Sequence, residues 1–129
     1  MLKKILKIIN FKSIKMATIN PYLTFNGTCE AAFLFYQSVF GGEFPYIGKF
    51  KDMPADDNCP PPTAEDAERV MHVSLPIGKE TILMGSDSTA QGGDVVFGGN
   101  FSISITTDST EKQTNFLTDF QQVETLSWR

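Results

Sequence analysis

The sequence has few of the residues on which catalytic and metal sites are usually built. It contains one histidine, His72, among 129 residues. Its two cysteines, Cys29 and Cys59, form no Cys-x-x-Cys pair, so neither a disulfide scaffold nor a structural zinc knuckle is expected. No basic residue and no second histidine adjoins either thiol, which leaves a thiolate nucleophile without support. Two unpaired thiols fit a reducing compartment, and we expect a cytoplasmic location.

Long apolar runs are also absent, so the sequence predicts no membrane-spanning segment. A phosphate-binding loop is missing too, because no G-x-x-x-x-G-K-[ST] pattern occurs, and the pairs Gly92-Gly93 and Gly98-Gly99 are typical of turns. The length and the 41% of hydrophobic residues fit one soluble globular domain.

Basic residues are scarce beyond the first fifteen positions. Five of the eleven lie in residues 1–15, which leaves six against fifteen acidic residues from Met16 onward. A body this acidic should repel phosphate backbones, so we expect no nucleic-acid partner. Residues 1–15 themselves suit a short basic amphipathic helix at a membrane surface, but lysines interrupt every apolar run that a signal peptide would need. We favour a leader outside the fold, followed by a domain that begins at Met16.

The first half of the domain reads as a strand, a helix and a second strand. Residues 19–25 favour a strand, and Asn26-Gly27 closes it with a turn. Thr28 is then a suitable N-cap for a helix with apolar residues at three-four spacing, which Gly41-Gly42 ends. Residues 42–53 read as the second strand, and the acidic, proline-rich residues 53–68 as a long loop.

The second half predicts a hairpin, a connector and one more strand. Residues 70–75 and 80–84 are strands around a turn, and residues 86–100 form a Gly- and Ser-rich connector. Apolar and hydroxyl residues alternate strictly through residues 101–107, the period of a half-buried strand, and residues 108–111 favour the start of a helix. The expected fold class is therefore α+β, one βαβββ module followed by an incomplete second module.

The ordered string of segments resembles a known family. INPYLTFNGTCEAAFLFYQSVFGGEF, RVMHVSLPIGKETILMGSD and GGNFSISITTDSTE are similar to the PhnB-like branch of the vicinal oxygen chelate superfamily, some members of which carry a 3-demethylubiquinone-9 3-methyltransferase-like label. The superfamily also holds glyoxalase I, bleomycin-resistance proteins and extradiol dioxygenases. The resemblance covers residues 19–111 and bears on fold more than on activity, since one fold hosts many functions.

The resemblance implies a cup formed by two βαβββ modules, with a small-molecule ligand inside and a homodimer as the assembled form. In metal-dependent relatives a divalent ion in the cup acts as a Lewis acid, and such an ion would give this chain lyase, transferase or dioxygenase-like activity. Where those relatives carry metal-ligating histidines, this chain has Pro21 and Asn100-Phe101, whose Pro and Phe side chains cannot ligate. The leading interpretation is a small-molecule-binding or metal-assisted enzyme module of the glyoxalase and bleomycin-resistance type. The alternatives are a non-catalytic protein that binds or sequesters a small molecule, and an inactive truncated product.

His72 is the leading candidate for a catalytic or metal-ligating residue on the inner wall of the cup. Strand alternation places Val70 and Ser74 on its face and Met71 on the opposite, helix-covered face. An imidazole side chain is a common general acid or base in proteins, although an ordinary hydrogen-bonded sheet histidine is the simpler interpretation. Glu80, at the start of the returning strand, is a second catalytic candidate that would share this face, or else a solvated hairpin charge.

Hydroxyl side chains are the candidates for binding a small polar ligand. Ser74 accompanies His72, and three residues of the last predicted strand would line the cup opposite it: Ser102, Ser104 and Thr106. Plain strand alternation explains these three equally well. Several aromatic residues are expected in the core: Tyr22, Phe25, Phe33, Phe35 and Tyr36.

The tail departs from the resemblance after about residue 115. We therefore expect a domain at residues 16–115 and an unrelated tail at residues 116–129, without the three strands that would complete the cup. A shifted reading frame of the tail can be back-translated into a family-like segment, so a frameshift near Asn115 is one hypothesis, which the nucleotide sequence would test. An unpaired strand at residues 101–107 is expected to promote dimerisation or aggregation.

Overall fold

The structure is a computed structural model that describes residues 17–54, 56 and 60–124. Its elements follow one another as strand, helix, three strands and a final helix, with two single-turn helices in the third connection. Their bounds are β1 Tyr22–Phe25, α1 Cys29–Phe40, β2 Tyr46–Lys49, η1 Phe50–Asp52, α2 Ala64–Ala67, β3 Val70–Ile77, β4 Thr81–Asp87 and α3 Thr110–Glu124. The predicted βαβββ module is confirmed.

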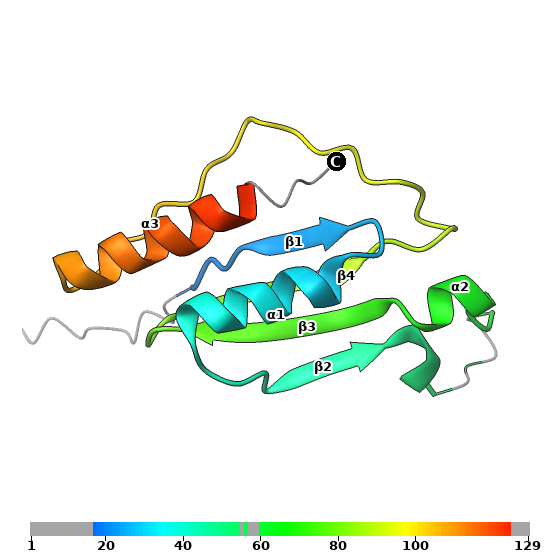
Figure 1. Cartoon of the computed structure of the whole chain (residues 1–129). Coiled ribbons are helices and arrows are strands. Elements are labelled where there is room, and N and C mark those ends of the chain that lie inside the picture. Colours follow the sequence, from blue (N-terminus) through cyan, green and yellow to red (C-terminus); the bar gives the residue numbers. More distant parts are fainter. Residues whose placement is uncertain (1–16, 55, 57–59, 125–129) are drawn as a thin grey trace, which may run out of the picture.

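The four strands form one sheet in the order β1-β4-β3-β2. β1 runs parallel to β4, and the other two pairs are antiparallel. Figure 1 shows α1 lying across one face of this sheet. Because side chains alternate along a strand, each strand sends one set of residues under α1 and the other set to the opposite face.

The core lies between α1 and the sheet. Phe33 of α1 is fully buried and meets Phe25 of β1 and Tyr36 edge-on, with ring centroids 6.4 and 5.5 Å apart. β3 and β4 contribute the aliphatic part of the cluster, whose buried hydrophobic members are Phe25, Cys29, Ala32, Phe33, Val70, Val73, Leu75 and Leu83. Phe25, Phe33 and Tyr36 thus occupy the core region predicted for them, whereas Tyr22 is 48% exposed on the other face.

The N-terminus of α1 is capped from a distant strand. Thr28 makes no side-chain capping hydrogen bond, contrary to expectation. Instead, Oδ1 of Asp87, at the end of β4, accepts hydrogen bonds from the backbone N–H groups of Gly27 at 2.8 Å and Cys29 at 3.0 Å. Oδ2 of the same carboxylate accepts from Val70 N–H at 2.9 Å. One buried side chain therefore joins α1, β3 and β4.

A β-bulge changes the facing of the residues at the start of β3. Gly48 pairs with His72, but the next residue of β2, Lys49, pairs with Val70, so Met71 is the extra residue. The bulge turns Val70 into the core, where it is 1% exposed. The prediction that Val70 shares the face of His72 was wrong for this reason.

Residues 101–107 do not form a strand. They have no regular secondary structure and pair with no strand, and Phe101, Ile103 and Ile105 are 65%, 55% and 45% exposed. In Figure 1 the segment arches away from the sheet before α3 begins. The prediction of a half-buried strand is therefore wrong. Alternation gives the segment an apolar face, but no described strand of this chain pairs with residues 101–107.

Helix α3 begins where the sequence predicted a helix start, and it continues past residue 115, the expected end of the domain. Ser109 Oγ accepts a hydrogen bond from Lys112 N–H at 3.3 Å, and α3 then runs from Thr110 across residue 115. Phe116 meets Phe40 of α1 with ring centroids 5.3 Å apart, and Phe120 meets the same ring at 5.9 Å. The first residues of the expected tail thus pack on α1. The proposed leader, residues 1–15, and residues 125–129 lie outside the described residues.

Candidate functional site

His72 lies on the sheet face opposite α1, which we call the open face. Cross-strand pairing fixes the neighbours: Tyr22 pairs with Met84, Met84 with Ser74, and Ser74 with Tyr46. This row crosses all four strands, and His72 lies in the next row, paired with Gly48. Alternation assigns ten strand positions to the open face: Tyr22, Thr24, Tyr46, Gly48, His72, Ser74, Pro76, Ile82, Met84 and Ser86.

Two tyrosines flank His72. The hydroxyl of Tyr22 and Nδ1 of His72 are 3.3 Å apart, within hydrogen-bond distance, although β4 lies between their strands. Ring centroids of Tyr22 and Tyr46 lie 5.8 and 5.9 Å from that of His72, with tilts of 32° and 36°. The imidazole is therefore held between phenol rings that reach it from opposite sides.

Gly48 explains how Tyr46 reaches this position. A Cβ atom at residue 48 would lie 2.8 Å from Cζ of the Tyr46 ring, a distance that atoms in contact do not adopt. Only glycine lets the phenol lie flat over β2 and turn towards His72. Sequence reasoning missed Tyr46 altogether and assigned Tyr22 to the core. The signal that could have corrected this was the position of Tyr22, one residue before the inward-facing Leu23.

The open face is polar but carries no fixed charge. None of its ten strand positions holds Asp, Glu, Lys or Arg. Several of its polar groups make no hydrogen bond within the described part of the chain: Nε2 of His72 and the hydroxyls of Thr24, Tyr46, Ser74 and Ser86. Ser74, predicted as a ligand-binding residue, is thus beside Tyr46 with its hydroxyl unused.

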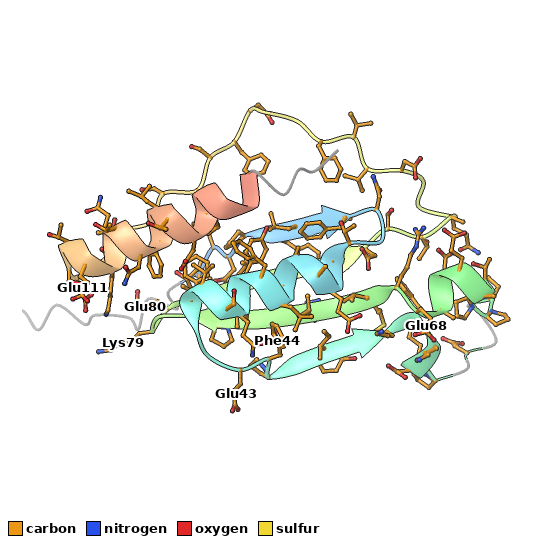
Figure 2. All side chains as sticks on the ribbon, viewed as in Figure 1. Glu43, Phe44, Glu68, Lys79, Glu80 and Glu111 are labelled. Atoms are coloured by element: carbon orange, nitrogen blue, oxygen red, sulfur yellow. The ribbon has the colours of Figure 1, made fainter. Side chains whose placement is uncertain are left out.

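Glu80 is not brought to His72. It is exposed in the turn between β3 and β4, and Figure 2 shows it with Lys79 at the end of this hairpin. His72 lies five residues before the last residue of β3, a distance of about 16 Å along an extended strand. The expectation that Glu80 shares the site is wrong, because the hairpin is longer than the sequence pattern indicated.

The hydroxyls of residues 102–106 lie elsewhere too. Ser104 and Thr106 line a cavity of about 580 Å³ together with Leu83 of β4 and Phe40 of α1, which face away from His72. Ser102 is exposed. Since residues 101–107 join no sheet, they do not stand opposite His72 as expected.

Two apolar cavities lie along β1 and α1. The second, of about 530 Å³, is bounded by Phe25, Phe97 and Phe101, and both cavities share Leu23, Tyr36 and Ile103. Neither is lined by His72, but Tyr22 and Thr24 of the open face also line the second cavity, which therefore reaches that face at its β1 edge.

The donor set around His72 does not fit a divalent metal. Its neighbours on the open face are phenols and hydroxyls, whereas such an ion is held by several imidazole, carboxylate or thiolate groups. Within residues 17–54, 56 and 60–124, no three His, Cys, Asp or Glu side chains gather where they could hold a metal ion. His72 would be the single protein ligand of this type at the site.

The thiol of Cys29 is expected to be unreactive. The residue is fully buried at the start of α1, and burial raises the pKa of its thiol to about 12, with further increases from the nearby Asp87 and Glu30. A thiol with this pKa is protonated at neutral pH and is a poor nucleophile.

We expect the free energy of unfolding to fall as the pH rises above about 9. The unfolded thiol of Cys29 titrates near its ordinary pKa of 9.0, whereas the folded thiol has a pKa of about 12. Between these values the unfolded chain has lost a proton that the folded chain keeps, so stability present below pH 9 declines towards pH 12. Urea unfolding across this range measures the slope, and Cys29→Ala should flatten it. An equal slope in that variant would contradict the assignment.

Comparison with known proteins finds a curated relative that matches only part of this chain. No family model matches it. Protein YjdN of Escherichia coli K12 is 32% identical over 79 residues, which is 57% of this chain and 53% of YjdN. The chain therefore spans about half the length of this curated relative.

Two solved structures are similar over most of the chain. Protein PA1353 of Pseudomonas aeruginosa has a TM-score of 0.65 at 29% identity, covering 81% of this chain and 71% of that one. A Bacillus cereus PhnB protein, described as a putative 3-demethylubiquinone-9 3-methyltransferase, has a TM-score of 0.58 at 23% identity, covering 80% and 72%. The chain has a PhnB-like fold. None of the described helices has the length and apolar character needed to cross a membrane.

Proposed function

We propose that this chain is a PhnB-like small-molecule-binding protein of the glyoxalase and bleomycin-resistance type, and that its ligand lies on the open face. The observation that carries the proposal is His72, held between Tyr22 and Tyr46 on a face where every hydroxyl except that of Tyr22 has no described partner. Half-exposed aromatic rings with free polar groups are typical of ligand sites, which combine apolar area with a few orienting hydrogen bonds. Membership of the vicinal oxygen chelate superfamily and a cytoplasmic location are part of this proposal.

Ligand binding is favoured over metal-assisted catalysis by the chemistry of the donor groups. Two phenols and several hydroxyls beside one imidazole suit hydrogen bonding to an organic ligand, and they lack the carboxylates that would accompany a histidine ligand. We therefore assign His72 and Ser74 to ligand recognition.

We further propose that a second copy of the chain supplies the wall opposite the open face. The outer edge of β1 is unpaired among the described strands, and residues 96–105 expose apolar side chains, with Val96 91% and Phe97 68% exposed. Free strand edges and exposed apolar segments promote association between chains. Sedimentation velocity should show a dimer, and a monodisperse monomer at micromolar concentration would contradict this.

Binding at the open face is testable by mapping backbone amide shifts in the uniformly ¹⁵N-labelled chain. A mixture of small aromatic fragments should shift the amides of Ser74, Met84 and Ser86, which lie on the open face. Shifts confined to Leu23, Tyr36 and Ile103 would instead locate binding in the apolar cavities and overturn the proposal.

A further inference from the structure

The hydrogen bond between Tyr22 and His72 restricts which ring nitrogen carries the proton. A phenol O–H is a stronger donor than a neutral imidazole N–H, and an imidazole nitrogen is a stronger acceptor than a phenol oxygen. At 3.3 Å the favoured arrangement therefore has Tyr22 O–H donating to Nδ1. The neutral ring then keeps its proton on Nε2, the nitrogen that has no partner among the residues described.

The free Nε2–H makes His72 a hydrogen-bond donor for a ligand. Tyr46 adds a phenol ring tilted by 36° to the imidazole, and Ser74 stands beside Tyr46 in the adjoining row. A ligand that meets these groups together has a flat ring and an oxygen acceptor on that ring. Aromatic side chains favour such a ring through offset or edge-on contacts.

The electrostatics of the open face select among such ligands. With no Asp, Glu, Lys or Arg at its strand positions, the face offers no counter-charge to an ion that loses water there. The chain as a whole has a formal net charge of −4, which further disfavours an anion. A cation would meet uncharged hydroxyl oxygens and the faces of the two tyrosine rings, but no carboxylate at these strand positions.

We infer that the open face recognises an uncharged planar ring bearing a carbonyl-type oxygen, which accepts a hydrogen bond from Nε2–H of His72. This inference rests on the proposed function and names the chemical class of its ligand. Tyr22 is a positioning residue, because it fixes the proton of His72, while Tyr46 and Ser74 contact the ring and its substituents.

The experiment uses His72 as its own reporter, because it is the one histidine in the sequence. In the ¹⁵N-labelled full chain at pH 8, the imidazole nitrogen shifts should identify the Nε2–H tautomer. Three probes share one ring and differ in charge: acetophenone, benzoate and benzylammonium. Acetophenone should shift the imidazole signals saturably, with a Kd at least tenfold below the Kd of either ion.

Two variants separate a positioning role from a structural one. Tyr22→Phe keeps the ring but removes the hydroxyl, and should move the tautomer balance towards Nδ1–H and weaken acetophenone binding at least threefold. The matched control is Tyr36→Phe, which removes the hydroxyl of the third tyrosine, on the α1 side. This control should leave both the tautomer and the Kd unchanged.

Each contrary outcome would refute a specific part of the inference. Tighter binding of benzoate or benzylammonium at His72 would refute the uncharged class while leaving the proposed function intact. An Nδ1–H tautomer in the unaltered chain, or equal effects of the two variants, would refute the role of Tyr22. If none of the three probes moves His72 or the neighbouring amides, the inference and the proposed site both fail.

Discussion

Replacing Asp87 with alanine should lower the free energy of unfolding by about 3 kcal/mol or more. The carboxylate accepts backbone hydrogen bonds from Gly27, Cys29 and Val70, and the last two residues are 0% and 1% exposed. Each buried N–H left without an acceptor costs about 1–3 kcal/mol. Since small domains are stable by only about 5–15 kcal/mol, urea unfolding should show a large fall in the midpoint.

The matched control is Asp108→Ala. Asp108 also lies just before a helix, but it is exposed and pairs with Lys112 at 2.8 Å. Exposed ion pairs contribute little to stability because water and salt screen them, so this variant should unfold almost as the unaltered chain does. Similar losses in the two variants would show that the three hydrogen bonds of Asp87 are not specific stabilising contacts. Asp87→Asn, which retains one acceptor oxygen, should fall between them.

Asp87 also illustrates what the sequence could not reveal. The helix of residues 29–40 and its stop at the two glycines were predictable, because periodicity and glycine punctuation are local signals. The cap was assigned to Thr28 for the same local reason. The actual acceptor lies about sixty residues away, and only the parallel pairing of β1 with β4 brings it to the start of α1.

Residues 101–107 show the reverse case, in which a strong local pattern predicted an element that the structure does not contain. Their alternation is a strong local signal for a strand, but a strand exists only where another backbone accepts its hydrogen bonds. In this chain the segment lies beside the apolar cavities, and Ile103 is 55% exposed. The pattern therefore indicates which face would be buried, and not whether a partner strand is present.

The candidate site was predictable in its centre but not in its surroundings. A lone histidine on an alternating strand could be assigned to a face, and Ser74 followed from it. The bulge at Met71 moved Val70 to the core, and the length of the hairpin kept Glu80 away. Tyr46 could not be placed without the register of β2 against β3, which depends on the sheet as a whole.

Replacing Phe33 with alanine should destabilise the chain by about 3–5 kcal/mol, the range measured for large aromatic residues removed from cores. Its ring is fully buried and contacts Phe25 and Tyr36 edge-on. The adjacent Leu34 is 53% exposed, so Leu34→Ala provides a control on the same helix, expected within about 0.5 kcal/mol of the unaltered chain. Equal losses at the two positions would mean that α1 does not pack on the sheet through Phe33.

The same ring should couple energetically to Gly85 of β4. A Cβ atom there would lie 2.6 Å from Cε2 of Phe33 and 2.8 Å from the backbone oxygen of Leu23. Gly85→Ala alone should therefore cost about 1–3 kcal/mol through overpacking. In the Phe33→Ala background the ring is gone and only the contact with Leu23 remains. Gly85→Ala should then destabilise the chain less, by at least about 0.5 kcal/mol, the lower end of the coupling energies measured for residues in contact. Strict additivity in this double-mutant cycle would show that the cost of Gly85→Ala does not depend on the Phe33 ring. Close packing of α1 against Gly85 would then not contribute to stability through this contact.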